Sequence, residues 1–214
     1  MKYIIMCGGH YDGWHKPRQL IEVAGEPVVM RTIRLLRAAG ADDIAISTDD
    51  GRFEECGVPL LKHCNDFKQA GSQFDGLWTD AFYPSPDPAC YIFGDVVFSP
   101  DAIQTIVSTK TKGIEFFASA PPFDERYIKS YAEPFAFKVI NQRRFRAAIE
   151  MVKEHEKAGL FNRPPIAWEL WQVIIGLDIN DIDYGSYIQI NDYTCDIDSY
   201  NDAEKMNEVL MREG

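Results

Sequence analysis

The chain has 214 residues and a formal net charge of −11 at pH 7, and its length and ordinary composition suit one domain with a sizeable core. The acidic balance argues against nucleic acid as a partner, because binding to a phosphate backbone requires a dense basic face. No apolar run approaches the roughly 18 residues that cross a membrane, and no signal-peptide pattern opens the chain. We therefore expect a cytoplasmic protein that binds no membrane. The five scattered cysteines include no Cys-x-x-Cys pair, which favours reduced thiols over disulfides or structural zinc.

The first twenty residues combine a predicted strand with a loop suited to binding phosphate. Residues 3–7 are apolar, as in strands that are covered on both faces. Gly8 and Gly9 follow directly, and glycines in this place let backbone N–H groups approach a ligand closely. Lys16 and Arg18 add positive charge to the same loop. This combination predicts a phosphate-binding loop.

The spacing excludes two familiar phosphate-binding loops. A P-loop requires Lys and then Ser or Thr directly after its last glycine, whereas Gly13 is followed by Trp14. The dinucleotide fingerprint runs from its glycines straight into a helix, and Pro17 interrupts here. The stretch is therefore another kind of nucleotide loop, or a surface loop with incidental basic residues.

The next elements indicate an α/β fold. Residues 28–39 carry apolar side chains at helical spacing, and residues 44–48 form the next predicted strand. Two parallel strands joined by a helix make a right-handed βαβ unit. Ligands of such sheets bind at the carboxyl ends of the strands, which places Thr48 on the ligand side. A short edge strand at 59–61 and a helix beginning within 71–78 complete this half.

A second strong pattern lies in the middle of the chain, where the predicted strand 90–93 ends in Gly94 and Asp95. A carboxylate at the end of a buried strand is costly unless it is paired or bound to a metal. Asp95 is therefore a candidate metal ligand, with the capping of a neighbouring turn as the alternative. Residues 99–101, Ser-Pro-Asp, then give a clear helix start.

Two further strands, at 114–118 and 135–140, flank an insertion at 121–134 that is rich in aromatic and charged side chains. This insertion is where we expect an acceptor to be recognised. A helix capped by Asn141 follows and extends to about Lys157.

The last quarter of the chain contributes two helices and a strand. A helix beginning near Pro164 carries Trp168 and Trp171 on one face, which favours core packing. The alternative is that Trp168, with Glu169 beside it, cradles a cationic head group.

The closing segment places several acids before the final helix. A last predicted strand at 187–190 leads to Asp196 and Asp198, which share a face in extended backbone. Asn201 and Glu204, three residues apart, predict a capping box that opens the helix.

Three of these motifs, in this order, resemble those of the sugar-phosphate nucleotidyltransferases with a GT-A-like fold. The matching residues are Gly8, Gly9, Pro17-Arg18, Leu20 and Gly25-Glu26-Pro27 in the opening, Gly94-Asp95 in the middle, and 196–202 at the end. The opening departs from the family because it lacks the Gly-x-Gly-x-Arg core and carries Arg18 where Lys is usual.

The resemblance implies both a fold and an activity. The fold is a single α/β domain over 1–214, a three-layer sandwich with a mostly parallel, Rossmann-like (GT-A-like) sheet. The activity is transfer of a nucleoside monophosphate from an NTP, with CTP slightly favoured, to a small phosphorylated acceptor with release of pyrophosphate. The expected cofactor is Mg²⁺, held by Asp95 and Asp198 with Asp196 in reserve.

The remaining site residues follow from the same resemblance and from the position of the insertion. Arg18 and Lys16 would be catalytic, because they would hold the triphosphate. The expected nucleotide-binding residues are Cys7, Gly8, Gly9, Tyr11, Thr48, Ser72 and Gly94. The expected acceptor-binding residues are Arg126, Lys129, Tyr131 and Trp168.

Two alternative functions stay open. A GT-A glycosyltransferase would be expected to carry Asp-x-Asp at the end of a central strand, which residues 94–97 lack. A catalytically silent, nucleotide-binding member of the fold is compatible with the altered first loop. The sequence leaves the identity of the acceptor and the oligomeric state open.

Overall fold

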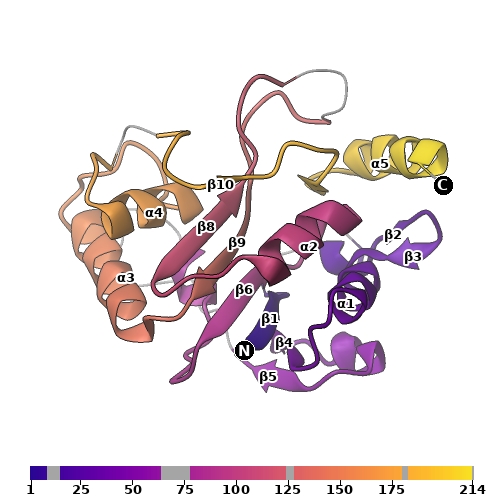
Figure 1. Ribbon diagram of the computed structural model, residues 1–214, viewed down its shortest axis with the longest axis horizontal. Helices are drawn as coiled ribbons and strands as arrows, with labels where there is room; N and C mark the ends of the chain where they lie inside the picture. The colour runs from indigo at the N-terminus through magenta and orange to yellow at the C-terminus, as the bar shows by residue number, and fades with distance from the viewer. Residues whose placement is uncertain (9–14, 64–77, 124–127, 180–182, 214) are drawn as a thin grey trace.

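The computed structural model describes residues 1–8, 15–63, 78–123, 128–179 and 183–213. Its centre is a seven-stranded sheet with the strand order β10-β8-β9-β6-β1-β4-β5 (Figure 1). The strands are β1 Lys2–Met6, β4 Ile44–Thr48, β5 Leu60–Lys62, β6 Ala89–Phe93, β8 Ile114–Ala118, β9 Pro134–Val139 and β10 Ile188–Gln189. β9 is antiparallel to both of its neighbours, and every other pair in the sheet is parallel. The mostly parallel sheet predicted from the sequence is confirmed.

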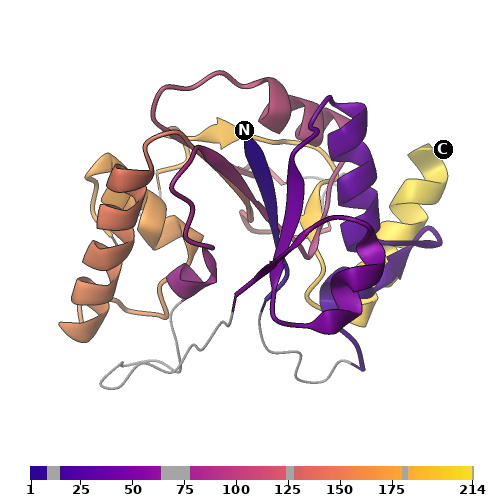
Figure 2. The same cartoon turned by 90° about the horizontal axis from the view of Figure 1, so that it is seen from below.

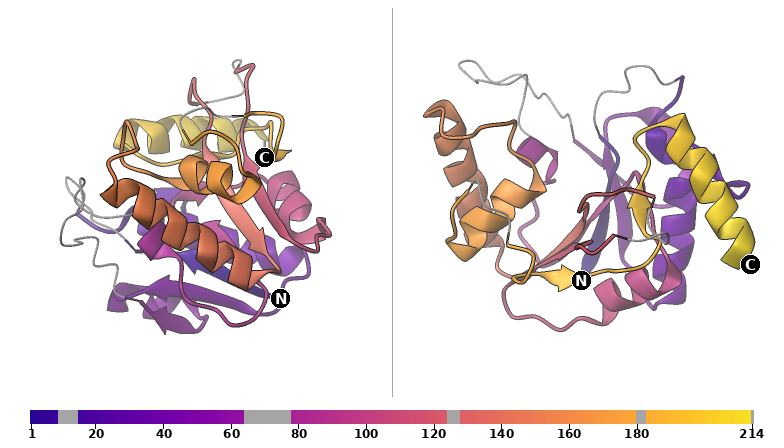
Figure 3. Two further views of the ribbon diagram at one scale, coloured as in Figure 1. Left: turned by 90° about the vertical axis from the view of Figure 1, so that its left-hand side faces the viewer. Right: turned by 90° about the horizontal axis from the view of Figure 1, so that it is seen from above.

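Helices cover both faces of the sheet, as Figure 2 shows. α3 and α4 lie on one face, and α1, α2 and α5 lie on the other; Figure 3 shows the same two layers from other directions. Their bounds are α1 Val28–Ala38, α2 Pro100–Ser108, α3 Gln142–Lys157, α4 Ala167–Ile175 and α5 Tyr200–Glu213. Short 3₁₀ turns span Arg18–Leu20, Gly51–Cys56 and Trp78–Ala81. The three-layer α/β architecture is therefore confirmed. None of the described helices is both long and apolar enough to cross a membrane.

Two short two-stranded ribbons lie beside the main sheet, and one of them places the closing segment next to the end of β6. β7 (Val96–Val97) pairs antiparallel with β11 (Cys195–Asp196). The N–H of Ile197 donates to the carbonyl of Asp95 at 2.9 Å. The other ribbon is a hairpin of β2 (Glu22–Val23) and β3 (Glu26–Pro27). Asp95 and the acids after β11 therefore lie side by side.

A second, small core fixes this closing segment in place. It contains apolar side chains from the hairpin, α1, β7, β11 and α5, namely Ile21, Val23, Val28, Val97, Cys195, Ile197, Ala203, Met206 and Leu210. Burying such side chains stabilises each by about 1.5–3 kcal/mol relative to full exposure. The start of α5 is therefore held against the body of the protein.

The helix starts are set by local side-chain caps. Ser99 Oγ accepts from the N–H of Ala102 at 2.9 Å, and Asn141 Oδ1 accepts from the N–H of Arg144 at 2.9 Å, as predicted. α4 begins at Ala167, after the two prolines, and not at Pro164.

The predicted cap of the last helix is wrong by two residues. α5 begins at Tyr200, so Ser199 and not Asn201 is its N-cap. The N–H of Asp202 donates to Ser199 Oγ at 3.2 Å, and the N–H of Ser199 donates to Asp202 Oδ2 at 3.0 Å. These reciprocal bonds are those of a capping box, with Asp202 in the role expected for Glu204.

Candidate active site

A cavity of about 410 Å³ opens at the carboxyl ends of β1 and β6. This volume lies in the usual range for small-molecule sites. Its lining contains glycine backbone, several aromatic rings and charged side chains from all three sequence motifs. The charged residues are Arg18, Asp95, Glu133, Arg163, Asp196 and Asp198.

Gly94 lets the strand end with Asp95 approach the end of β1. Its N–H donates to the carbonyl of Met6 at 3.1 Å. A Cβ atom at this position would lie 2.4 Å from Met6 O and 2.7 Å from Cys7 Sγ, which is closer than real side chains come. Only glycine fits here without a shift of the backbone. The fold therefore requires glycine at position 94 whether or not a nucleotide binds.

Arg18 joins the middle motif to the closing motif. Its Nη1 donates to Oδ1 of Asp198 at 2.7 Å, and its Nη2 lies 3.3 Å from Oδ2 of Asp95. The 3₁₀ turn that begins at Arg18 orients the guanidinium, with the N–H of Leu20 bonded to Pro17 O at 2.9 Å. Burial raises the pKa of Asp95 to about 6, although the Arg18 charge acts in the opposite direction.

Lys129 lies on the acidic side of the cavity, with its side chain only 10% exposed. Its Nζ is 2.9 Å from Asp198 Oδ2, 3.1 Å from Asp202 Oδ2, 3.3 Å from Asp196 Oδ1 and 3.8 Å from Glu133 Oε1. Together with Asp95, these four acids form what we call the acid cluster.

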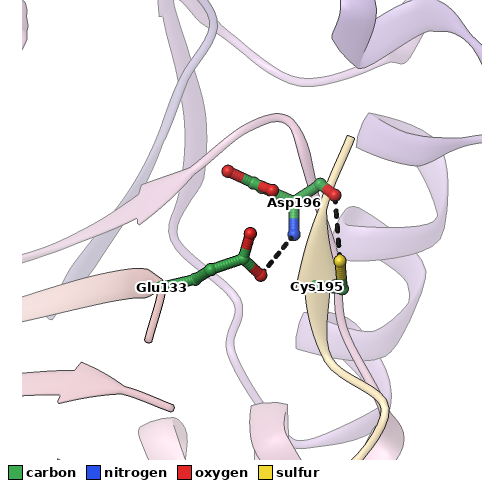
Figure 4. Close-up of side chains that lie close together, drawn as sticks. All are labelled: Glu133, Cys195 and Asp196. Carbon is green, nitrogen blue, oxygen red and sulfur yellow. Dashed lines mark hydrogen bonds between the residues drawn. The ribbon is translucent and has the colours of Figure 1, made fainter. Parts of the chain in front are cut away.

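Glu133 and Asp196 approach each other at the buried end of the acid cluster (Figure 4). The N–H of Asp196 donates to Oε2 of Glu133 at 3.4 Å. Glu133 Oε1 and Asp196 Oδ1 are buried and make no hydrogen bond with the described residues, and the charge beside them is the Lys129 ammonium, 3.8 and 3.3 Å away. Burial and the adjacent Asp196 carboxyl group raise the pKa of Glu133 to about 10.

Cys195 is the third potential metal ligand at this end. Its Sγ and one oxygen each of Glu133 and Asp196 all lie within 4.8 Å of one another. Burial raises the pKa of the thiol, which donates to the carbonyl of Asp196 at 3.1 Å. A neutral thiol that is already a donor is a poor ligand, so the carboxylates are the better candidates.

Arg163 is fixed on the wall of the cavity near α4. Its Nε donates to Oε1 of Glu169 at 2.6 Å, and Oε2 of Glu169 accepts from the N–H of Ile166 at 2.9 Å. No other hydrogen-bond partner of the guanidinium is found in the described part of the chain. The same contacts occupy Glu169, so its carboxylate is not free to hold a cationic head group beside Trp168.

The structure brings together eight of the residues singled out in the sequence. Those that line the cavity are Gly8, Arg18, Gly94, Asp95, Tyr131, Trp168, Asp196 and Asp198. Trp168 also packs edge-on against Phe116, with ring centroids 5.2 Å apart, so it serves the core as well. Lys129 reaches the site through the acids that it contacts.

Three other expected residues do not line the cavity. Cys7 is fully buried behind Gly94, Thr48 is buried with its Oγ1 accepting from the N–H of Asp50, and Lys16 lies two residues before Arg18. Gly9, Tyr11, Ser72 and Arg126 lie outside the described residues, as do positions 71–77 of the helix expected to begin within 71–78. At Trp78 the structure has the 3₁₀ turn Trp78–Ala81.

Sequence reasoning missed Glu133 and Arg163 as site residues. Glu133 is one of three acids within the expected insertion, and its contact with Asp196 spans 63 positions. Arg163 stands before two prolines in a segment without a motif. The two prolines and Glu169, at the third position of α4, would have indicated where this helix begins. They would not have indicated that Arg163 faces the cavity.

Together, the α/β sheet and the cavity at its carboxyl edge, lined by glycine, arginine and carboxylates, form a site where open α/β sheets bind their ligands. The family comparison is specific: the sequence pattern of the MobA-like NTP transferase domain matches residues 3–163. The chain belongs to this family.

Individual relatives are more distant. A 3-deoxy-manno-octulosonate cytidylyltransferase from Anaeromyxobacter sp. (strain Fw109-5) is 26% identical over 155 residues, which cover 70% of this chain and 57% of that protein. This chain therefore spans a little over half the length of that relative.

Solved structures show the same fold. A CMP:2-keto-3-deoxy-manno-octonic acid synthetase complexed with CTP aligns over 100% of both chains with a TM-score of 0.59 and 14% identity. An inositol-1-phosphate CTP transferase from T. maritima aligns over 97% of this chain and 95% of its own, with a TM-score of 0.56 and 11% identity. At these identities the likeness concerns the fold alone.

Proposed function

We propose that the protein is a metal-dependent nucleotidyltransferase that joins a nucleoside monophosphate to a small phosphorylated acceptor. The observation that carries the proposal is the placement of Arg18 between Asp95 and Asp198 at the mouth of the cavity. The Arg18 guanidinium and the two carboxylates come from three distant motifs and meet where parallel strands end. Ligands bind such sheets at this edge, including those that carry phosphate groups. Family membership supports the transferase class.

The donor set fits Mg²⁺. Asp95, Asp196 and Asp198 line one cavity; the buried Oδ1 of Asp196 makes no hydrogen bond in the described structure and is paired only through charge, with Lys129 at 3.3 Å. Mg²⁺ prefers carboxylate oxygens of this kind. When bound by Asp95 and Asp198, with Asp196 in reserve, it would neutralise charge on the phosphate oxygens.

The reaction itself requires little from the protein beyond positioning and charge. An oxygen of the acceptor phosphate attacks the α-phosphorus of the NTP, the bond from that phosphorus to the β-phosphate oxygen breaks, and pyrophosphate leaves. The attacking phosphate is already anionic at neutral pH, so no general base is needed. Arg18 stabilises negative charge that develops on the phosphoryl group. Gly8 lines the same cavity as Arg18, and its backbone would lie along the chain of phosphates.

The nucleotide and acceptor occupy different walls in this proposal. The aromatic side chains of Trp78, Tyr131 and Trp168 line the cavity together with Arg163. We assign this wall, made by the segment before β9 and the start of α4, to the acceptor. CTP is the favoured nucleotide, because the relative identified by sequence is a cytidylyltransferase.

The test is pyrophosphate release with each of the four NTPs and a panel of sugar phosphates, phosphorylated alcohols and sugar acids. Release that depends on both CTP and one acceptor class supports the proposal. Glycosyl transfer from a nucleotide sugar would instead identify a glycosyltransferase. Nucleotide binding without turnover on any acceptor would identify a silent member of the fold.

A further inference from the structure

The acid cluster contains two cationic positions, and different side chains fill them. Arg18 contacts Asp95 and Asp198. Lys129 contacts the other three acids and Asp198, which both cations share. Partly buried carboxylates without compensation are costly, so each cation stabilises the acids around it.

Lys129 also connects the acid cluster to the start of α5. Oδ2 of Asp202, which Lys129 contacts at 3.1 Å, accepts the N–H groups of Ser199 and Asp198 at 3.0 and 3.2 Å. The ammonium is therefore bound to the turn that carries Asp198, and together with Arg18 it holds the Asp198 carboxylate in place. The small core beneath this turn keeps the rest of the segment in place.

The surroundings of the ammonium are those of a bound cation. Four carboxylates from two separate parts of the chain surround its Nζ within 3.8 Å, and the ring centroid of Tyr131 is 5.7 Å away. A divalent ion at the facing oxygens of Glu133 and Asp196 would lie against this positive charge. Coulomb repulsion over such short distances is strong in a shielded site.

From these contacts we propose that Lys129 is a positioning residue that serves as a built-in cation. Its ammonium takes the place in the acid cluster where a second divalent ion would otherwise bind. One exchangeable divalent ion then remains, beside Asp95 and Asp198. There it displaces the guanidinium of Arg18, which is 27% exposed and pairs with two acids, whereas Lys129 is 10% exposed and pairs with four. The consequence for turnover rests on the proposed function, but the number of ions bound is a property of the free protein.

The direct test counts ions bound to the nucleotide-free protein. Titration with Mn²⁺, followed by its electron paramagnetic resonance signal, should give one ion per chain for the wild type. Lys129→Met, which keeps the length and removes the charge, should bind two. Lys129→Arg keeps the charge and should bind one.

A second measurement follows thermal stability with and without Mg²⁺. Lys129→Met should lower Tm by about 10 °C without a divalent ion, since it leaves several carboxylates uncompensated. Millimolar Mg²⁺ should restore more than half of this loss. Lys138→Met is the matched control, because Lys138 is 5% exposed and its Nζ donates to the backbone carbonyls of Ile106, Val107 and Thr109. Its loss of Tm should be unaffected by Mg²⁺.

Two results would overturn the inference: a wild-type count other than one ion, or a count in Lys129→Met equal to that of the wild type. If Lys129→Met is too unstable for titration, absence of rescue by Mg²⁺ counts against it equally. The counts are independent of catalysis. Expected counts with no pyrophosphate release would refute the proposed function and leave the role of Lys129 intact.

Discussion

Arg18 and Asp198 lie 180 positions apart in the chain, and their side chains form a hydrogen-bonded ion pair of 2.7 Å. The ion pair joins the two ends of the sequence at the site, because Arg18 belongs to the first loop and Asp198 to the turn before α5. The same guanidinium reaches Asp95 at the end of β6. The geometry makes Arg18 the residue on which the convergence of the three motifs depends.

Arg18→Ala should lower kcat by about 10²–10³, the scale for the loss of one group that stabilises a transition state. The reason is that no other cationic side chain among the described residues contacts both Asp95 and Asp198. Steady-state pyrophosphate release measures the effect. Arg34→Ala, which removes a surface partner of Glu26, is the control and should keep the wild-type rate. A wild-type kcat in Arg18→Ala would remove Arg18 from the catalytic site.

Asp95→Asn should make the metal-free protein more stable at neutral pH while it abolishes activity. Burial raises the pKa of Asp95 from 3.8 to about 6 in the folded state. The protonated form therefore favours folding, and this contribution is present below about pH 3.8 and lost as pH rises through about 6. Asn keeps the neutral state at every pH.

We expect Asp95→Asn to raise the free energy of unfolding by about 2 kcal/mol at pH 7.5 and to change it little at pH 4, since one pKa unit corresponds to about 1.4 kcal/mol. Urea unfolding in the presence of a chelator measures both values. Asp43→Asn at the exposed pair with Lys2 should show no such pH dependence. Equal stability of Asp95→Asn and wild type at pH 7.5 would contradict the raised pKa of the Asp95 carboxyl group.

Gly94→Ala should destabilise the protein by about 1–3 kcal/mol, the usual cost of overpacking. The added methyl would meet the Met6 carbonyl at 2.4 Å, and backbone cannot rotate away as a side chain can. Gly113→Ala is the matched control, because a Cβ there meets nothing within 4 Å. Urea unfolding of the two variants measures the difference. If both lose the same amount, the close approach of β1 and β6 at this point is not what requires glycine.

The elements that sequence reasoning predicted well are those with strong local signals. Ser99 and Asn141 offer a capping oxygen just before an apolar helical pattern, and the structure uses both. Asp95 could be singled out because a carboxylate at the end of an apolar strand is costly to bury unless it is paired or binds a metal. Such signals depend on neighbours in sequence, so they survive without knowledge of the fold.

The cap of α5 shows where local signals are not sufficient. Ser199 with Asp202 and Asn201 with Glu204 are equivalent patterns, each a capping residue with an acid three positions on. The contact of Lys129 with Asp202 Oδ2 at 3.1 Å favours the first pair, and this contact spans 73 positions. Glu133 was missed for the same reason. Its significance comes from the proximity of Asp196, which no spacing within the loop before β9 reveals.

Arg163→Gln should weaken binding of the acceptor and leave binding of the nucleotide unchanged. The Arg163 guanidinium is held on the cavity wall by Glu169, and its terminal nitrogens have no other partner in the described residues, so they can donate to an anionic or polar group of the acceptor. Because a hydrogen bond to a charged group contributes roughly 1.5–3 kcal/mol, KM for the acceptor should rise by about 10–100-fold. Initial rates over a grid of NTP and acceptor concentrations separate the two KM values. Arg143→Gln, an exposed arginine of α3, should leave both unchanged. A rise in KM for the NTP with the acceptor KM intact would place the base on this wall and reverse the proposed orientation of the two substrates.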